Sequence, residues 1–223
     1  MSAIAPSAPH SRRIPLTLKL ALTAFVAVQV CCYWSAWGPT NFLYFCDVAL
    51  FLTLISVLTE KSLPASMAAV GILLPQLLWV IDFAGTLLGH PLVGLTGYMF
   101  QDNQPLHVRG ISLFHGWLPF LLLFIISRLG YDRFALPAWL VLAWGLMLIA
   151  YFLLPAPPAP LDQPNLPVNV NYVYGMSDDA PQQWMPPLAW LGLMMAGLPL
   201  VLFVPTHLLL SWWRGGVTQD TLR

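Results

Sequence analysis

Residues 41 to 58 read NFLYFCDVALFLTLISVL, an apolar run whose first residues include an amide, a thiol and a carboxylate. The rest of the run is apolar apart from one Thr and one Ser. A helix that crosses a bilayer needs about 20 mostly apolar residues, at a rise of about 1.5 Å per residue. The stretch therefore predicts a short membrane-spanning helix with Asn41, Cys46 and Asp47 near one end.

The whole chain has the composition of an integral membrane protein. Its 223 residues are 58% hydrophobic and 8% charged, and the mean hydropathy is +0.73. A soluble domain carries roughly 25% charged residues, so this chain cannot build a charged surface that faces water. The formal net charge is zero, so we expect no nucleic-acid partner. The three cysteines, Cys31, Cys32 and Cys46, are too few for a disulfide scaffold and lack metal-binding spacing.

Apolar stretches of spanning length recur along the chain and are separated by turn residues. We predict an all-α fold, a polytopic membrane helix bundle that forms a single membrane domain over residues 1–223. Six transmembrane helices are expected at 15–36, 41–58, 64–88, 111–128, 134–154 and 188–213. We expect the first to be retained rather than cleaved as a signal peptide, because signal h-regions span only about 7–15 residues.

The basic residues are distributed unequally between the two sides of such a bundle. Arg109 alone lies in the first, third or fifth loop. The other eight lie at the termini or in the second and fourth loops: Arg12, Arg13, Lys19, Lys61, Arg128, Arg133, Arg214 and Arg223. The positive-inside rule then places both termini in the cytoplasm, with tails 1–14 and 214–223. The size of the chain favours the inner (plasma) membrane of a bacterium.

A proline-rich segment, 155–187, is predicted to face outward between the last two spans. It holds nine prolines, so its first half is expected to be extended and stiff. Its second half contains NVNYVYG (169–175), in which Val alternates with Asn or Tyr. This pattern fits a short strand, a substrate-facing lid with Tyr172 and Tyr174 as binding residues, or an ordered cap over the bundle.

Ionisable side chains lie at similar predicted depths in three consecutive spans. Cys46 and Asp47 fall roughly 10 Å below the outer end of the second span, and Asp82 roughly 9 Å below that of the third. His115 lies about one turn into the fourth span. A charged group at bilayer depth costs roughly 2.5–3.5 kcal/mol, so such groups usually face a cavity or a partner. We therefore predict an outward-facing polar cavity between these helices.

The residue types suggest a thiol mechanism for this cavity. Beside His115 as a base, Cys46 becomes a candidate nucleophile, and Asp47 or Asp82 could orient the imidazolium. Arg109 could hold a phosphate or carboxylate headgroup. Further candidate substrate-binding residues lie at the same mouth: Asn41, Tyr44 and His107.

Plainer interpretations stand beside this one. The two carboxylates could be structural, bonded to neighbouring hydroxyl or indole groups or paired with Arg109. Cys46 could be a small core residue or form a disulfide bond with Cys31 or Cys32. The three histidines near the mouth match no familiar ligand spacing, so no metal site and no cofactor is predicted.

The chain resembles the YwaF-like bacterial integral membrane proteins. The motifs that carry the resemblance follow the family's order over the second to sixth spans: NFLYFCDVAL (41–50), FAGTLLGHPLVGL (83–95), HVRGISLFHGWLP (107–119) and NVNYVYG (169–175). The family is distantly related to a transmembrane acyltransferase of ether phospholipids and to androgen-induced hydrolases of fatty-acid esters. The resemblance implies a Cys46 nucleophile and a His115 base. Tyr44 departs from the pattern, because the bacterial motif has His there and the hydrolases have Thr.

Two functional hypotheses follow. The first is a lipid acyltransferase or ester hydrolase that acts near the outer leaflet through Cys46 and His115. The second is a non-enzymatic binder, transporter or assembly factor with a polar cavity lined by Asp47, Asp82 and His115. Both predict membrane lipids as surroundings and a lipid or small amphipathic molecule as the substrate or ligand.

Overall fold

The computed structural model describes residues 14–90, 92–101 and 104–220, and within these it contains helices and loops but no strand. The predicted all-α fold is confirmed. The α-helices are α1 (Leu16–Trp37), α2 (Phe45–Thr59), α3 (Ser62–Leu87), α4 (Leu106–Ser112), α5 (Phe114–Leu129), α6 (Ala135–Leu153), α7 (Pro187–Leu198) and α8 (Val204–Asp220). The shorter helical segments are η1 (Pro39–Leu43), η2 (Gly97–Phe100), η3 (Val170–Tyr172) and the π-helical η4 (Pro199–Phe203), which joins α7 to α8.

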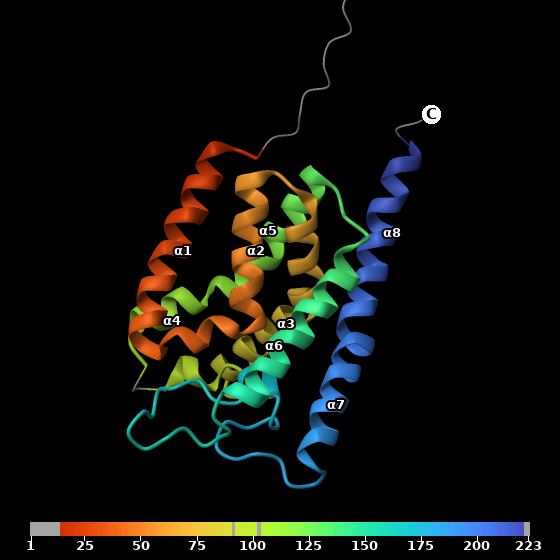
Figure 1. Cartoon of the computed structure of the whole chain (residues 1–223). Coiled ribbons are helices and arrows are strands. Elements are labelled where there is room, and N and C mark those ends of the chain that lie inside the picture. The colour runs from red at the N-terminus through yellow and green to blue at the C-terminus, as the bar shows by residue number, and fades with distance from the viewer. Residues whose placement is uncertain (1–13, 91, 102–103, 221–223) are drawn as a thin grey trace, which may run out of the picture.

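The long helices run along a common axis, and α3 is the central one (Figure 1). It contacts α2, α5, α6 and α8, while α1 packs against α2 and α4. The start of α1 and the end of α8 lie at the same end of the bundle (Figure 1). The segments that connect α1 to α2, α3 to α4 and α6 to α7 gather at the opposite end.

Five of the described helical units are long and apolar enough to cross a membrane, as expected for a multi-pass membrane protein. They are α1, α3, α4 with α5, α6, and α7 with α8 as far as Arg214. The remaining apolar helix, α2, has 15 residues and a length of about 22 Å, which is short for a span. The prediction of six crossings therefore stays a prediction.

Two of the predicted spans begin elsewhere in the structure. The second was expected from residue 41 but α2 starts at Phe45, because Pro39–Leu43 forms a separate turn and Tyr44 is extended. The fourth was expected from residue 111, whereas the helical unit starts at Leu106. Both differences lie at the end of the bundle that carries the functional candidates.

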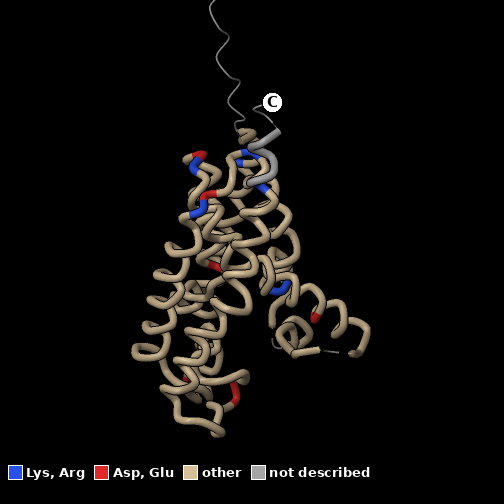
Figure 2. Tube along the Cα trace, turned by 90° about the vertical axis from the view of Figure 1, so that its right-hand side faces the viewer, with Lys and Arg blue, Asp and Glu red and all other residues tan. Residues whose placement is uncertain are grey.

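Lys and Arg concentrate at the end of the bundle where α1 begins and α8 ends (Figure 2). Lys19 and Glu60 form an ion pair there, between α1 and the turn after α2. The predicted tail 1–14 lies outside the described residues except for Ile14, and the tail 214–223 is described only as far as residue 220. The cytoplasmic location of this end stays a prediction.

The segment NVNYVYG forms an ordered cap, one of the three alternatives considered from the sequence, and not a strand. Val170 and Val173 are buried in an apolar cluster with Met147 of α6 and Leu191 of α7. The strand interpretation was wrong because Asn171 adopts a positive φ, which breaks the extended alternation that the sequence suggested. The cap covers α6 and α7 at the end of the bundle opposite the start of α1 and the end of α8.

Candidate functional site

Asp47 is a buried carboxylate in the first turn of α2. Its side chain is 2% exposed. Gln29 of α1 donates its amide N–H to Oδ1, and Asn41 of η1 donates to Oδ2 at 3.2 Å. Within the described residues no Lys, Arg or His lies within ion-pair distance of this carboxylate. Asp47 is thus solvated by two neutral amides and lacks a counter-ion.

The start of α2 is held in place by the cap. Asn171 accepts the Phe45 backbone N–H at 3.0 Å and donates to the Leu43 carbonyl, also at 3.0 Å. Asn171 and Tyr172 both have φ near +60°, which is uncommon for a residue other than glycine and costs about 1–3 kcal/mol each. Because the cap fixes the N-terminus of α2, it also fixes the depth of Asp47.

A second polar group lies between α1, α3 and the start of α5. The hydroxyls of Tyr33 and Ser112 are hydrogen bonded at 2.7 Å, and Nδ1 of His115 lies 2.7 Å from the Ser112 carbonyl oxygen. Since a carbonyl only accepts, the neutral imidazole carries its proton on Nδ1 and leaves Nε2 as an acceptor. Trp79 of α3 stacks on the imidazole with ring centroids 4.9 Å apart.

Tyr98 of η2 lies between the residues around Asp47 and the hydrogen-bonded set of Tyr33, Ser112 and His115. It lies beside Ser112 and Trp79 and close enough to Cys46 and Asp47 to interact electrostatically with both. Burial raises the pKa of Tyr98 to about 12, so its phenol is neutral at physiological pH.

Several buried polar atoms of α1 and α3 lack a hydrogen-bond partner in the described part of the chain. They are both amide atoms of Gln76, Oε1 of Gln29 and Nε1 of Trp79. Gln76 is 1% exposed. Asp47 lies twelve residues before the end of α2 and Gln76 fourteen residues after the start of the antiparallel α3, so their levels differ by roughly 3 Å. Buried polar groups nearly always have partners, so this region calls for bound water or a ligand.

These residues make up the polar cluster: Gln29, Tyr33, Asn41, Asp47, Gln76, Trp79, Tyr98, Ser112 and His115.

Asp82 does not belong to it. Its Oδ1 accepts the backbone N–H groups of Leu92, Val93 and Gly94 at 2.7–3.0 Å. Its Oδ2 accepts both the backbone N–H and the hydroxyl of Thr96. Asp82 lies eight residues further from the α2–α3 turn than Asp47, which is roughly 12 Å along the helix axis. The predicted common layer was wrong for this residue, because η1 takes up residues 39–43 and α2 begins only at Phe45.

The predicted orientation of His115 by a carboxylate was also wrong. The imidazole is bonded to the Ser112 carbonyl, and neither Asp47 nor Asp82 is bonded to it. A catalytic role for these residues stays untested.

Cys46 is a free thiol, as are Cys31 and Cys32, so none of the bridges considered from the sequence is formed. Its Sγ lies 4.0 Å from Oδ2 of Asp47. Tyr44 and Tyr172 both lie near this thiol. Their role as substrate-binding residues stays a prediction. The ionisable group nearest to Cys46 is the carboxyl of Asp47, which does not favour a thiolate.

The remaining candidates are more peripheral. Arg109 donates to the Met99 carbonyl at 3.3 Å and forms no ion pair with Asp47 or Asp82. His107 is exposed on α4. Tyr174 stacks on Tyr151, and its hydroxyl donates to the Tyr151 carbonyl, so it holds the cap against α6.

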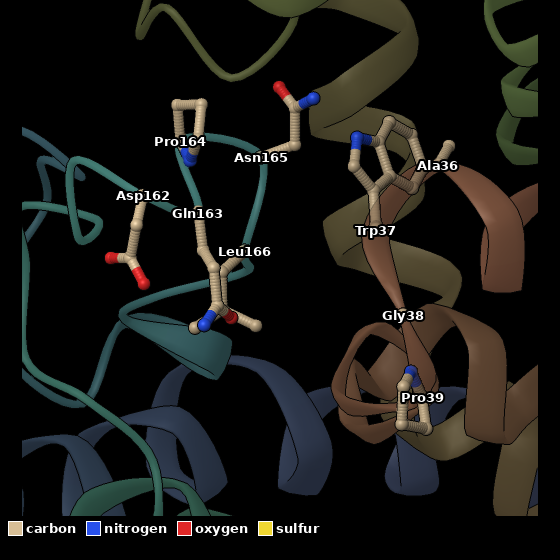
Figure 3. Close-up of a pocket in the computed structure, with 9 residues that line it drawn as sticks. All are labelled: Ala36, Trp37, Gly38, Pro39, Asp162, Gln163, Pro164, Asn165 and Leu166. Atoms are coloured by element: carbon tan, nitrogen blue, oxygen red, sulfur yellow. The ribbon is translucent and has the colours of Figure 1, made fainter.

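A separate hollow of about 400 Å³ lies between the end of α1 and the proline-rich segment (Figure 3). Its lining consists of Ala36, Trp37, Gly38, Pro39, Asp162, Gln163, Pro164, Asn165 and Leu166. Trp37 packs on Tyr33 with ring centroids 4.6 Å apart, so the wall of this hollow backs onto the polar cluster. No group of three or more His, Cys, Asp or Glu positioned for a metal ion occurs in the described residues.

The two glutamines were missed from the sequence. Gln29 stands in AVQVCC and Gln76 in LLPQLLW, each an isolated amide inside an apolar span. Such residues are uncommon at bilayer depth and usually face the bundle interior. Attention to amides as well as ionisable residues would have found both.

No family model, no curated protein and no solved structure matches this chain. The resemblance to the YwaF-like proteins therefore stays a prediction.

Proposed function

We propose that this multi-pass membrane protein binds a small amphipathic ligand whose protonated amine pairs with Asp47. The observation that carries the proposal is the buried Asp47 carboxylate with neutral amide donors and no counter-ion. A buried carboxyl group with no cation beside it tends to take up a proton, so a cationic ligand is the partner that would keep Asp47 ionised.

The surroundings suit such a ligand. Tyr33, Trp79 and Tyr98 supply aromatic surface, which attracts organic cations. The unpartnered amide of Gln76 can donate to and accept from a second polar group of the ligand. A few polar groups among apolar and aromatic side chains are typical of the lining of small-molecule sites.

The acyl-transfer hypothesis has less support. A nucleophilic thiol needs a neighbouring base or positive charge, and Cys46 has an anion beside it. Under our proposal Cys46 is a neutral wall residue, and replacing Cys46 by Ser preserves ligand binding. Under the enzyme hypothesis this replacement abolishes turnover of a lipid ester.

The thiol also provides a direct test. In the variant Cys31→Ser, Cys32→Ser, only Cys46 reacts with methanethiosulfonate reagents. The cationic 2-aminoethyl reagent should modify it about tenfold faster than the anionic 2-sulfonatoethyl reagent, after correction for their rates with 2-mercaptoethanol. Asp47→Asn should remove this preference. Ethylammonium chloride should slow modification by the neutral methyl reagent, whereas sodium propionate should not.

A matched control is the variant that keeps only Cys31, which is exposed on the outside of α1. This thiol should show no cation preference. The proposal fails if Cys46 has no preference for the cationic reagent, or if the preference survives Asp47→Asn.

A further inference from the structure

Asp82 has all the features of an anchor for the segment Leu92–Thr96. Its two oxygens accept five hydrogen bonds, and every donor comes from that segment. The contact is tight at the end of α3 as well. A Cβ added at Gly85 would lie 2.6 Å from the His90 carbonyl oxygen, so only glycine allows this approach.

The anchored segment continues directly into η2. Thr96, which gives Asp82 two of its hydrogen bonds, immediately precedes Gly97–Phe100. Two further contacts fix η2. The ring of Phe100 packs on Phe83 at 5.5 Å, and Arg109 donates to the Met99 carbonyl. The position of η2 thus depends on α3 through Asp82 and on α4 through Arg109.

The residue that η2 presents to the polar cluster is Tyr98. It stands two residues after Thr96, and its phenol lies near Ser112, Cys46 and Asp47. A displacement of the segment would therefore withdraw Tyr98 from the cluster.

We infer that Asp82 is a positioning residue, which fixes Leu92–Thr96 and thereby holds the Tyr98 phenol over the Cys46–Asp47 end of the polar cluster. Asp82 itself does not touch the ligand. The existence of a ligand is taken from the proposed function. The coupling between Asp82 and Tyr98 can nevertheless be measured in the protein without any ligand.

The test measures modification of Cys46 by methyl methanethiosulfonate in the Cys31→Ser, Cys32→Ser background. Asp82→Asn should raise the rate about tenfold, because the amide N–H₂ cannot accept the Thr96 donors. Tyr98→Ala should raise it to a similar extent. The double variant should react no faster than the faster single variant, since both remove the same cover.

Asp132→Asn is the matched control. Its carboxylate also caps a backbone N–H, that of Phe134, but at the end of α6 remote from Cys46. It should leave the Cys46 rate unchanged. The inference is overturned if Asp82→Asn leaves the rate of Cys46 modification unchanged. It is also overturned if the rate increase in the double variant equals the product of the two single increases, which is the result expected when each substitution loosens the fold independently.

The two proposals fail separately. In Asp82→Asn the preference of Cys46 for the cationic reagent should persist, because Asp47 is still present. Loss of that preference in every variant, with the Asp82–Tyr98 coupling intact, would refute the proposed function and leave the positioning role standing.

Discussion

At the scale of single residues, the hydrogen-bond donors around Asp82 and Asp47 distinguish a structural carboxylate from a candidate binding residue. Asp82 accepts five hydrogen bonds from one segment, four of them from backbone N–H groups, so its charge is satisfied internally. Asp47 has two amide donors and no cation. Hydrogen bonds alone can stabilise a buried carboxylate when enough donors are present. The two amide donors of Asp47 leave other lone pairs of its oxygens free to accept from a cation. Asp82 is therefore structural in its contacts, and Asp47 is available to a ligand.

Gln76 should show the conflict between stability and binding that a ligand site produces. Replacement by Met, of similar shape, removes two unpartnered polar atoms, each of which costs about 1–3 kcal/mol. We expect Gln76→Met to raise the midpoint of thermal unfolding in detergent and to weaken the protection of Cys46 by ethylammonium. Gln29→Met, which removes a donor to Asp47, should instead lower the midpoint. A lower midpoint for Gln76→Met would show that its amide is satisfied by bound water.

Asp178 should make the stability of the cap depend on pH. Burial raises the pKa of this carboxyl above its usual value, while a hydrogen bond from Asn169 lowers it in part. The folded protein then binds the proton more tightly than the unfolded chain. Its stabilising contribution is complete below the unfolded pKa of about 3.9 and is lost as pH rises through the folded pKa.

Asp178→Asn, which imitates the neutral form, should therefore unfold at a higher temperature than the wild type at pH 7. The difference should shrink as pH is lowered toward 4. A difference that grows on acidification would contradict the assignment.

At the scale of helices, close packing of α3 against α6 depends on one glycine. A Cβ added at Gly71 would lie 2.1 Å from the buried indole of Trp139, whereas one added at Gly145 of α6 meets no atom within 4 Å. Gly71→Ala should force the indole aside and destabilise the protein by about 1–3 kcal/mol. Gly145→Ala should be neutral or stabilising by up to about 1 kcal/mol, from helix propensity alone. The midpoints of thermal unfolding of the two variants measure this difference in stability. Equal midpoints would show that Gly71 does not pack closely against Trp139.

The helices themselves could be predicted because apolar run length and turn residues are local properties. Where α2 begins could not, because Asn171 caps it from a loop 126 residues away in the sequence. The same limit applies to the site. Asp47 and Asp82 look alike in the sequence, and only the fold brings Gln29 to one and Thr96 to the other. The alternation in 169–175 suggested a strand because the positive φ of Asn171 has no signature in hydropathy.

At the scale of the whole molecule, charge and site lie at opposite ends. Most Lys and Arg residues gather where α1 begins and α8 ends (Figure 2). The cap, η1 and η2 lie away from that end (Figure 1), and Asp47 is in the first turn of α2, shortly after η1. If the positive-inside rule holds for this chain, the charged end faces the cytoplasm and the proposed ligand site lies nearer the outer leaflet.

This topology and the crossing by α2 can be tested with three single cysteines in a background with Cys31, Cys32 and Cys46 replaced by Ser. Ser35→Cys near the end of α1 and Asp162→Cys in the proline-rich segment should react with a membrane-impermeant maleimide in intact cells. Lys61→Cys, in the turn after α2, should react only after permeabilisation. All three positions are exposed, so burial does not limit the reaction. Reaction of Lys61→Cys from the same side as Ser35→Cys would show that α2 does not cross the bilayer. Reaction of Lys61→Cys only after permeabilisation would show that α2 crosses. Because α2 is only about 22 Å long, the membrane would in that case have to thin around α2 or bury η1 as well.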